Sequence, residues 1–174
     1  MITVASYPAP WRDLVQRPDD RIRRARSLVG SVSRHRERGR PLSLSIEELA
    51  GRYHQGWADR SADVIAELHT DDSVFHMHGV TGPAVGRGPV RDLVASLLRL
   101  VPDLHFEAKR LYVGTDHIVF EYDMSGTADG SRFVCDGADV IAVTDGLVAR
   151  KDTYLDLVAL LDQIGTMPAM GADL

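Results

Sequence analysis

The chain has 174 residues, 44% of them hydrophobic, a formal net charge of −5 and a single cysteine, Cys135. This length and composition predict one folded domain with a sizeable core. They exclude an intrachain disulfide, and no apolar run approaches the length of a membrane span. The first residues lack the features of a signal peptide, so we expect a cytoplasmic protein that contacts no membrane.

Charge divides the chain near Pro41. Residues 1–40 carry ten arginines and a net charge of +6, whereas the remainder carries −11. We expect residues 1–44 to form an arginine-rich N-terminal extension, helical and resting on its own acidic domain or on a partner subunit. Nucleic acid or membrane binding is the alternative. Residues 21–40 contain no aromatic side chain that could stack on bases, so we predict no nucleic-acid partner.

Helical patterns begin after this extension. Ser45 and Glu48 form a capping box, and apolar residues that include Tyr53 and Trp57 follow at three- and four-residue steps. A second short helix is predicted after Ser61, then a strand over 73–78 and a glycine-rich loop over 79–88. A third helix follows, with proline in its first turn, and ends before the next proline, at position 102.

The rest of the chain alternates as four strands. Asp-Gly pairs at 129–130 and 145–146 predict tight hairpins between three of them. A short helix over 156–164 and a loose tail over 166–174 complete the chain. Helices followed by a mostly antiparallel meander indicate an α+β fold, with a curved sheet that wraps around a helix and leaves an open end for a ligand. The four predicted strands span residues 104–113, 117–126, 131–143 and 147–155.

One acidic residue interrupts the inward face of the third of these strands. Alternation over 133–143 places apolar side chains and Asp139 on one face. A buried carboxylate must either become neutral or pair with a cation, unless it lies at the sheet rim. Lys151 shares one face of the next strand with Thr153 and Leu155. If that face lines the pocket, Lys151 could pair with Asp139 or bind an acidic ligand; otherwise it is solvated.

The element order and three short motifs resemble the nuclear transport factor 2-like superfamily, and especially its SnoaL-like polyketide cyclases and ketosteroid isomerases. The resemblance covers residues 45–165, which we take as a SnoaL-like domain, and implies a cone-shaped fold, a homodimer and no cofactor. Its motifs are Leu68-His-Thr-Asp-Asp-Ser-Val-Phe, Gly86-Arg-Gly-Pro-Val-Arg and Asp145-Gly-Leu-Val.

The ketosteroid isomerase pattern matches this sequence at two site positions and departs from it at a third. Its oxyanion-hole tyrosine and aspartic acid fall on Tyr53 and Asp139, whereas its proton-abstracting aspartate is replaced by Met77. The resemblance implies that Asp139 acts as acid and base and that Tyr53 donates a hydrogen bond to the oxyanion. We expect these groups to share one cavity with the substrate-binding residues Trp57, Phe75, Met77, Phe120, Tyr122 and Lys151.

These residues predict a cofactor-independent cyclase or isomerase that acts on an apolar, carbonyl-bearing molecule, such as a polyketide- or steroid-like compound. The alternative is a non-catalytic domain that binds a small molecule or a protein. An epoxide hydrolase is less favoured, because Glu121 and Thr153 stand where an arginine and an aspartate would be required and only Asp123 matches.

Two histidines form a possible metal-binding pair. His76 and His78 lie on one face of the first predicted strand, but the sequence specifies no third ligand near them. We therefore expect no metal, and we expect these imidazoles to face solvent or a dimer partner.

Overall fold

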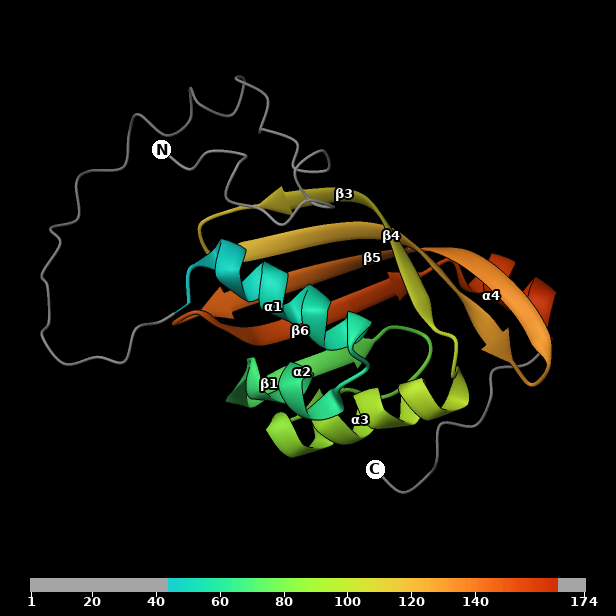
Figure 1. Cartoon of the computed structure of the whole chain (residues 1–174), viewed down its shortest axis with the longest axis horizontal. Coiled ribbons are helices and arrows are strands. Elements are labelled where there is room, and N and C mark those ends of the chain that lie inside the picture. The colour runs from blue at the N-terminus through green and yellow to red at the C-terminus, as the bar shows by residue number, and fades with distance from the viewer. Residues whose placement is uncertain (1–43, 166–174) are drawn as a thin grey trace, which may run out of the picture.

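Six strands form one curved sheet in the order β2-β1-β6-β5-β4-β3 in the computed structural model, which describes residues 44–165 (Figure 1). The predicted α+β class and the nuclear transport factor 2-like cone are confirmed. The helix expected in the arginine-rich extension and the tail over 166–174 lie outside the described residues. The elements are α1 (Ile46–Ala58), α2 (Ala62–Glu67), β1 (His69–Met77), β2 (Ala84–Val85), α3 (Arg87–Leu100), β3 (His105–Val113), β4 (His117–Ala128), β5 (Ser131–Thr144), β6 (Leu147–Leu155) and α4 (Leu157–Ile164).

The first helix begins as its sequence predicts. The Ser45 hydroxyl accepts the backbone N–H of Glu48 at 3.2 Å, and the Glu48 carboxylate accepts the backbone N–H of Ser45 at 2.8 Å. This capping box satisfies two donors that a helix start leaves free. The helix buries Leu49 and Tyr53 and lies across one face of the sheet (Figure 1). It therefore forms one wall of the space between helix and sheet.

The meander from β3 to β6 follows from its turn residues. Asp129-Gly130 and Asp145-Gly146 all have positive φ, between 48° and 82°. Two successive residues with positive φ form the turn that matches the twist of a tight hairpin, and Asp-Gly adopts it at low cost. Along β5, residues Phe133, Cys135, Asp139 and Ile141 are buried and their neighbours Val134 and Val140 are exposed, so the predicted alternation is correct.

The first strand differs from the sequence expectation in length and partners. It begins at His69 and pairs in parallel with β6, with a register irregularity between His69 and Val74. The loop predicted over 79–88 contains the short strand β2, which pairs antiparallel with β1. Arg87 secures the start of β1, since its guanidinium donates two hydrogen bonds to the His69 carbonyl, at 2.8 and 3.2 Å. The parallel pairing joins the first half of the domain to the end of the meander.

Two clusters of buried apolar side chains hold the domain together. The larger lies between α1, α2, α3 and the sheet, and the smaller between the distal part of the sheet, the end of α3 and α4. Among the described residues, none of the helices has the length and apolar character needed to cross a membrane. The space that remains open to a ligand borders the larger cluster.

Candidate active site

A small cavity of about 50 Å³ lies between α1 and the inward face of β3 to β6. At roughly 10–15 Å³ for each water-sized occupant, this volume holds a few water molecules. Most of its wall is apolar, and its polar groups gather at one place. The residues that bear on its chemistry are Tyr53, Trp57, Phe106, Phe120, Asp139 and Lys151.

The polar centre of this cavity is an ion pair. Lys151 Nζ lies 2.9 Å from Asp139 Oδ2, and the two side chains are only 5% and 7% exposed. The hydroxyls of Thr153 and Tyr122 donate to the other carboxylate oxygen, Oδ1, at 2.7 and 3.1 Å. Three donors therefore surround one carboxyl group. Of the two options for a buried acid, neutralisation or pairing with a cation, the structure contains the second.

Register explains why these groups meet. Asp139 stands opposite Phe120 of β4 and Thr153 of β6, so all three side chains project from the same sheet face. Gly137 gives Tyr122 the room it needs, because a Cβ atom there would lie 2.4 Å from the Tyr122 ring. The ring can then lie flat over the strand and direct its hydroxyl to Asp139.

Aromatic rings surround the lysine ammonium on the sides that Asp139 leaves open. Lys151 Nζ lies 5.4, 5.0 and 4.5 Å from the ring centroids of Tyr53, Trp57 and Phe75. The negative faces of aromatic rings attract a cation and compensate part of its lost hydration. Lys151 is therefore held as a charged, hydrogen-bond-donating group inside an apolar site.

Tyr53 is joined to a buried histidine that sequence reasoning missed. Tyr53 Oη lies 3.0 Å from Nε2 of His69, which is 0% exposed. Burial, and secondarily the Asp139 carboxylate, raise the pKa of Tyr53 well above its usual value of about 10, so it is a neutral phenol. His69 Nδ1 has no hydrogen-bond partner among the described residues. With its proton on Nε2, His69 donates to Tyr53 and leaves the phenol O–H free to point into the cavity.

Burial should make His69 a source of acid sensitivity. Desolvation, followed by the nearby Lys151 and Arg87 charges, lowers the pKa of His69 to about 3. An unfolded histidine titrates near 6.5, so below that pH the unfolded chain binds a proton that the folded chain excludes. The contribution of His69 to the free energy of unfolding is fully present above pH 6.5. It decreases as the pH falls toward 3, by up to about 1.4 kcal/mol for each pH unit.

Urea unfolding of wild type and His69→Gln between about pH 7 and pH 4.5 checks this expectation. Glutamine can keep the contact with Tyr53 but does not titrate, so the free energy of unfolding should fall less steeply with acidification in the variant. His117→Gln removes an exposed imidazole and serves as the control. Parallel slopes in wild type and His69→Gln would contradict the assignment.

The residues predicted for one cavity are divided between several places. Tyr53, Trp57, Phe120, Asp139 and Lys151 line the cavity. The remaining three, Phe75, Met77 and Tyr122, do not line it. Phe75 lies behind Lys151, Tyr122 lies beneath Asp139, and Met77 lines a second, apolar cavity of about 40 Å³ near α3 and α4.

Two of the three positions relevant to an epoxide hydrolase, Glu121 and Asp123, lie away from the cavity, and the third is Thr153, which contacts Asp139 but is not an aspartate. Asp123 pairs with Lys109 at 2.6 Å, and Glu121 pairs with Arg110 at 2.5 Å. All four are ion-pair partners on the outer face of the β3 and β4 strands, opposite the buried Tyr122. This geometry gives the epoxide hydrolase alternative no support.

The SnoaL-like domain profile matches residues 50–151, more than half of the chain, and the chain therefore belongs to this family. No curated protein matches the sequence.

Solved structures with the same fold are distant in sequence. A candidate SnoaL-like polyketide cyclase from Jannaschia sp. CCS1 is 21% identical, with a TM-score of 0.64 over 77% of this chain and 100% of that one. A ketosteroid isomerase-like protein from Catenulispora acidiphila in complex with trimethylamine is 19% identical, with a TM-score of 0.63 over 72% and 97%. An epoxide hydrolase from M. tuberculosis is 15% identical, with a TM-score of 0.59 over 70% and 90%. At these identities the likeness shows the fold alone. The homodimer expected from the resemblance stays a prediction.

Proposed function

We propose that this protein is a cofactor-independent enzyme that forms and rearranges an enolate of an apolar, carbonyl-bearing small molecule. The observation that carries the proposal is the buried Asp139–Lys151 pair at the wall of an aromatic cavity, 2.9 Å between charged atoms, with the Tyr53 phenol on the same wall. Membership of the SnoaL-like family and a neighbour crystallised with polyporic acid support a small-molecule ligand.

Each polar group has a role that its contacts allow. An ionised carboxylate has about four lone-pair sites, and three are used by Lys151, Thr153 and Tyr122. The fourth, on Asp139 Oδ2, takes a proton from the carbon next to the substrate carbonyl. The carbonyl oxygen becomes an enolate, which Lys151 and Tyr53 stabilise by donating hydrogen bonds.

The same proton then determines the product. If Asp139 returns the proton to a different carbon, the reaction is an isomerisation. If the enolate carbon instead attacks a second carbonyl in the same molecule, a ring closes and the new alkoxide takes the proton from Asp139. Asp139 must act as both base and acid, because Met77 replaces the usual first-strand carboxylate and lies at the other cavity.

The volume of the cavity limits the size of the substrate. An engineered cavity of about 150 Å³ holds benzene, and the present one measures about 50 Å³. A ring-sized substrate therefore fits only after α1 shifts away from the sheet, and the proposal includes that movement.

Deuterium incorporation from D2O tests the proposal without knowledge of the final product. Cyclic and ring-fused ketones and 1,3-diketones are first screened for raising the unfolding temperature, because a ligand of the folded state stabilises it. For compounds that bind, we expect the protein to catalyse exchange of the protons next to the carbonyl, observed by NMR. Binding of such compounds with no exchange above the uncatalysed rate at any pH would contradict the enzyme proposal.

One observation favours a non-catalytic binding domain as the second candidate. Asp139 already accepts from three groups, an arrangement that equally serves to keep a buried charge stable while the cavity holds a ligand. Binding without exchange in the same experiment would support this alternative.

A further inference from the structure

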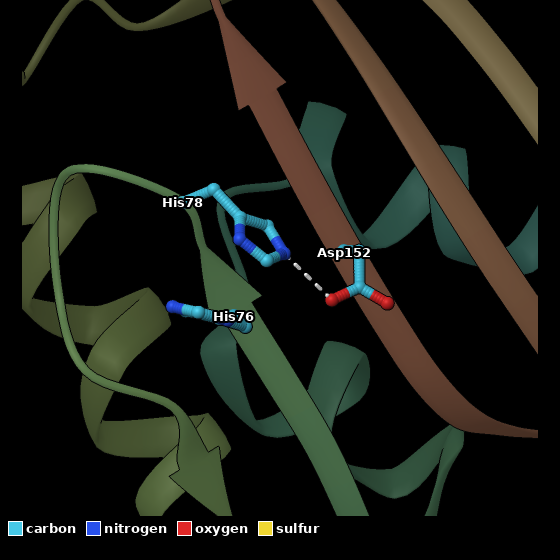
Figure 2. Close-up of side chains that lie close together, drawn as sticks. All are labelled: His76, His78 and Asp152. Carbon is cyan, nitrogen blue, oxygen red and sulfur yellow. Dashed lines mark hydrogen bonds and ion pairs between the residues drawn. The ribbon is translucent and has the colours of Figure 1, made fainter.

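The outer face of the β1–β6 junction carries three ligating side chains that the proposed activity does not use. His76 lies near the end of β1, His78 directly follows that strand, and Asp152 lies on β6 (Figure 2). His76 stands directly opposite Asp152 in the parallel register. The neighbouring residues of both strands point inward and are buried, so these three project from the opposite face of the sheet.

We propose that His76, His78 and Asp152 form a binding site for a divalent transition-metal ion, with Zn²⁺ as the preferred probe. One nitrogen from each imidazole and one carboxylate oxygen lie within 4.8 Å of one another. Two imidazoles and a carboxylate are a ligand set that binds zinc and related ions and leaves at least one coordination position open. The structure thus supplies the third ligand whose absence from the local sequence led us to expect no metal.

The three groups are close to coordination geometry but need to contract. Ligand atoms around a tetrahedral zinc ion stand about 3.3 Å apart, so the widest separation in the set, which is at most 4.8 Å, must close by up to about 1.5 Å. Rotation of the His76 side chain supplies the movement. Its ring packs against the His78 ring, at 3.8 Å between centroids, and within residues 44–165 its nitrogens form no hydrogen bond. Turning it toward an ion therefore breaks no polar contact.

The other two ligands are already oriented. His78 Nε2 lies 2.9 Å from Asp152 Oδ1, and the His78 ring stacks on Tyr154 at 4.4 Å and an angle of 4°. Arg150 donates to both carboxylate oxygens of Asp152, at 2.6 and 2.8 Å. Outer groups of this kind fix the direction of a metal ligand. An ion that binds between the ligands replaces the hydrogen bond between His78 and Asp152. The hydrogen bonds from Arg150 still orient the carboxylate.

Charge and exposure also suit a cation. Asp152 contributes a carboxylate oxygen, which attracts a cation, beside the two imidazole rings. The His78 and Asp152 side chains are 33% and 14% exposed. An ion can therefore reach them from solvent and would be partly buried once bound. Because the ligands come from two strands, a bound ion would tie β1 to β6 at their parallel junction.

Calorimetric titration of the full chain, made without a polyhistidine tag, with Zn²⁺ tests the site. We expect one ion for each chain. His76→Gln, His78→Gln and Asp152→Asn should each weaken binding at least tenfold. His117→Gln is the matched control, because His117 also contacts a carboxylate, Asp116 at 2.8 Å, but has no second imidazole beside it. Its binding should equal that of wild type. Equal affinity in wild type and the three ligand variants, or no saturable binding by wild type, would overturn the proposal.

Cobalt gives a second measurement that needs no variant. Co²⁺ bound by two imidazoles, a carboxylate and one further group should develop the intense visible bands of a four-coordinate ion. The unfolding temperature of wild type should rise with Zn²⁺ concentration, because the ion ties two strands only in the folded state. A cobalt spectrum that stays that of the hydrated ion, or an unfolding temperature that Zn²⁺ leaves unchanged, would overturn the proposal even if a ligand variant fails to fold.

Discussion

Lys151→Met should lower the free energy of unfolding by about 3–5 kcal/mol, because it leaves the Asp139 carboxylate buried without its cation. Both members of the pair are almost fully buried, at 5% and 7% side-chain exposure, so water cannot replace the lost partner. Adding Asp139→Asn to the lysine variant removes the stranded charge and keeps an oxygen that accepts from Thr153 and Tyr122. The double variant should therefore be more stable than Lys151→Met alone.

Urea unfolding at neutral pH measures all corners of this double-mutant cycle. Lys109→Met is the matched control, since Lys109 also pairs with aspartates, Asp123 and Asp136, but on the exposed outer face. Its loss should have little effect. A Lys151→Met variant as stable as wild type, or a double variant whose loss is the sum of the two single losses, would show that the buried pair is not energetically coupled.

Asp139→Asn should reduce the rate of carbonyl-adjacent proton exchange by about 100- to 10,000-fold if Asp139 is the base of the proposed reaction. Asparagine preserves the shape and the hydrogen bonds at Oδ1 but cannot take a proton. Exchange is followed by NMR in D2O with a ketone that binds wild type, at a temperature where the variant is folded. A loss in the rate with little change in ligand affinity locates the effect in the chemical step.

The size of the loss distinguishes two roles. If Asp139 only donates or accepts a hydrogen bond, the asparagine variant should retain most of the rate. Asp136→Asn is the control for a change of charge near the site. Asp136 directly precedes Gly137 and lies on the exposed face of β5. Equal rates in wild type and Asp139→Asn would remove Asp139 from the proposed mechanism.

Helix caps, helical spacing and hairpin signals predicted the α+β class, the family resemblance predicted the cone, and strand alternation predicted half of the polar centre. The Asp-Gly turns and the period-two pattern over 133–143 are local signals, and they placed Asp139 on the inward face where the structure has it buried. Lys151 could not be placed with the same certainty. Strands β5 and β6 change register between Ala142 and Val143, and an irregularity of this kind decides which side chains of the next strand face the pocket.

His69 and Asp152 escaped sequence reasoning for a different physical reason. His69 precedes two acidic residues in a segment that resembles a turn, so the sequence pattern starts the strand at Ser73 and does not extend it back to His69, where the structure begins β1. Asp152 reaches His76 through a parallel pairing of strands that are far apart in the chain. Hairpin partners can be inferred from the turn between them, but nothing in a single sequence specifies the partner of a parallel strand.

The parallel junction of β1 with β6 also has a consequence for how the domain folds. The hairpins of the meander close over turns of two or three residues, whereas joining β1 to β6 encloses most of the domain in one loop. The entropy of loop closure grows with loop length, and such non-local pairings slow folding. The meander can therefore form first, with Asp139 and Lys151 already on adjacent strands, and β1 docks late to bring His69 beneath Tyr53. In the transition state for folding, the ion pair should therefore already be formed, whereas the contacts that build the cavity walls should form later.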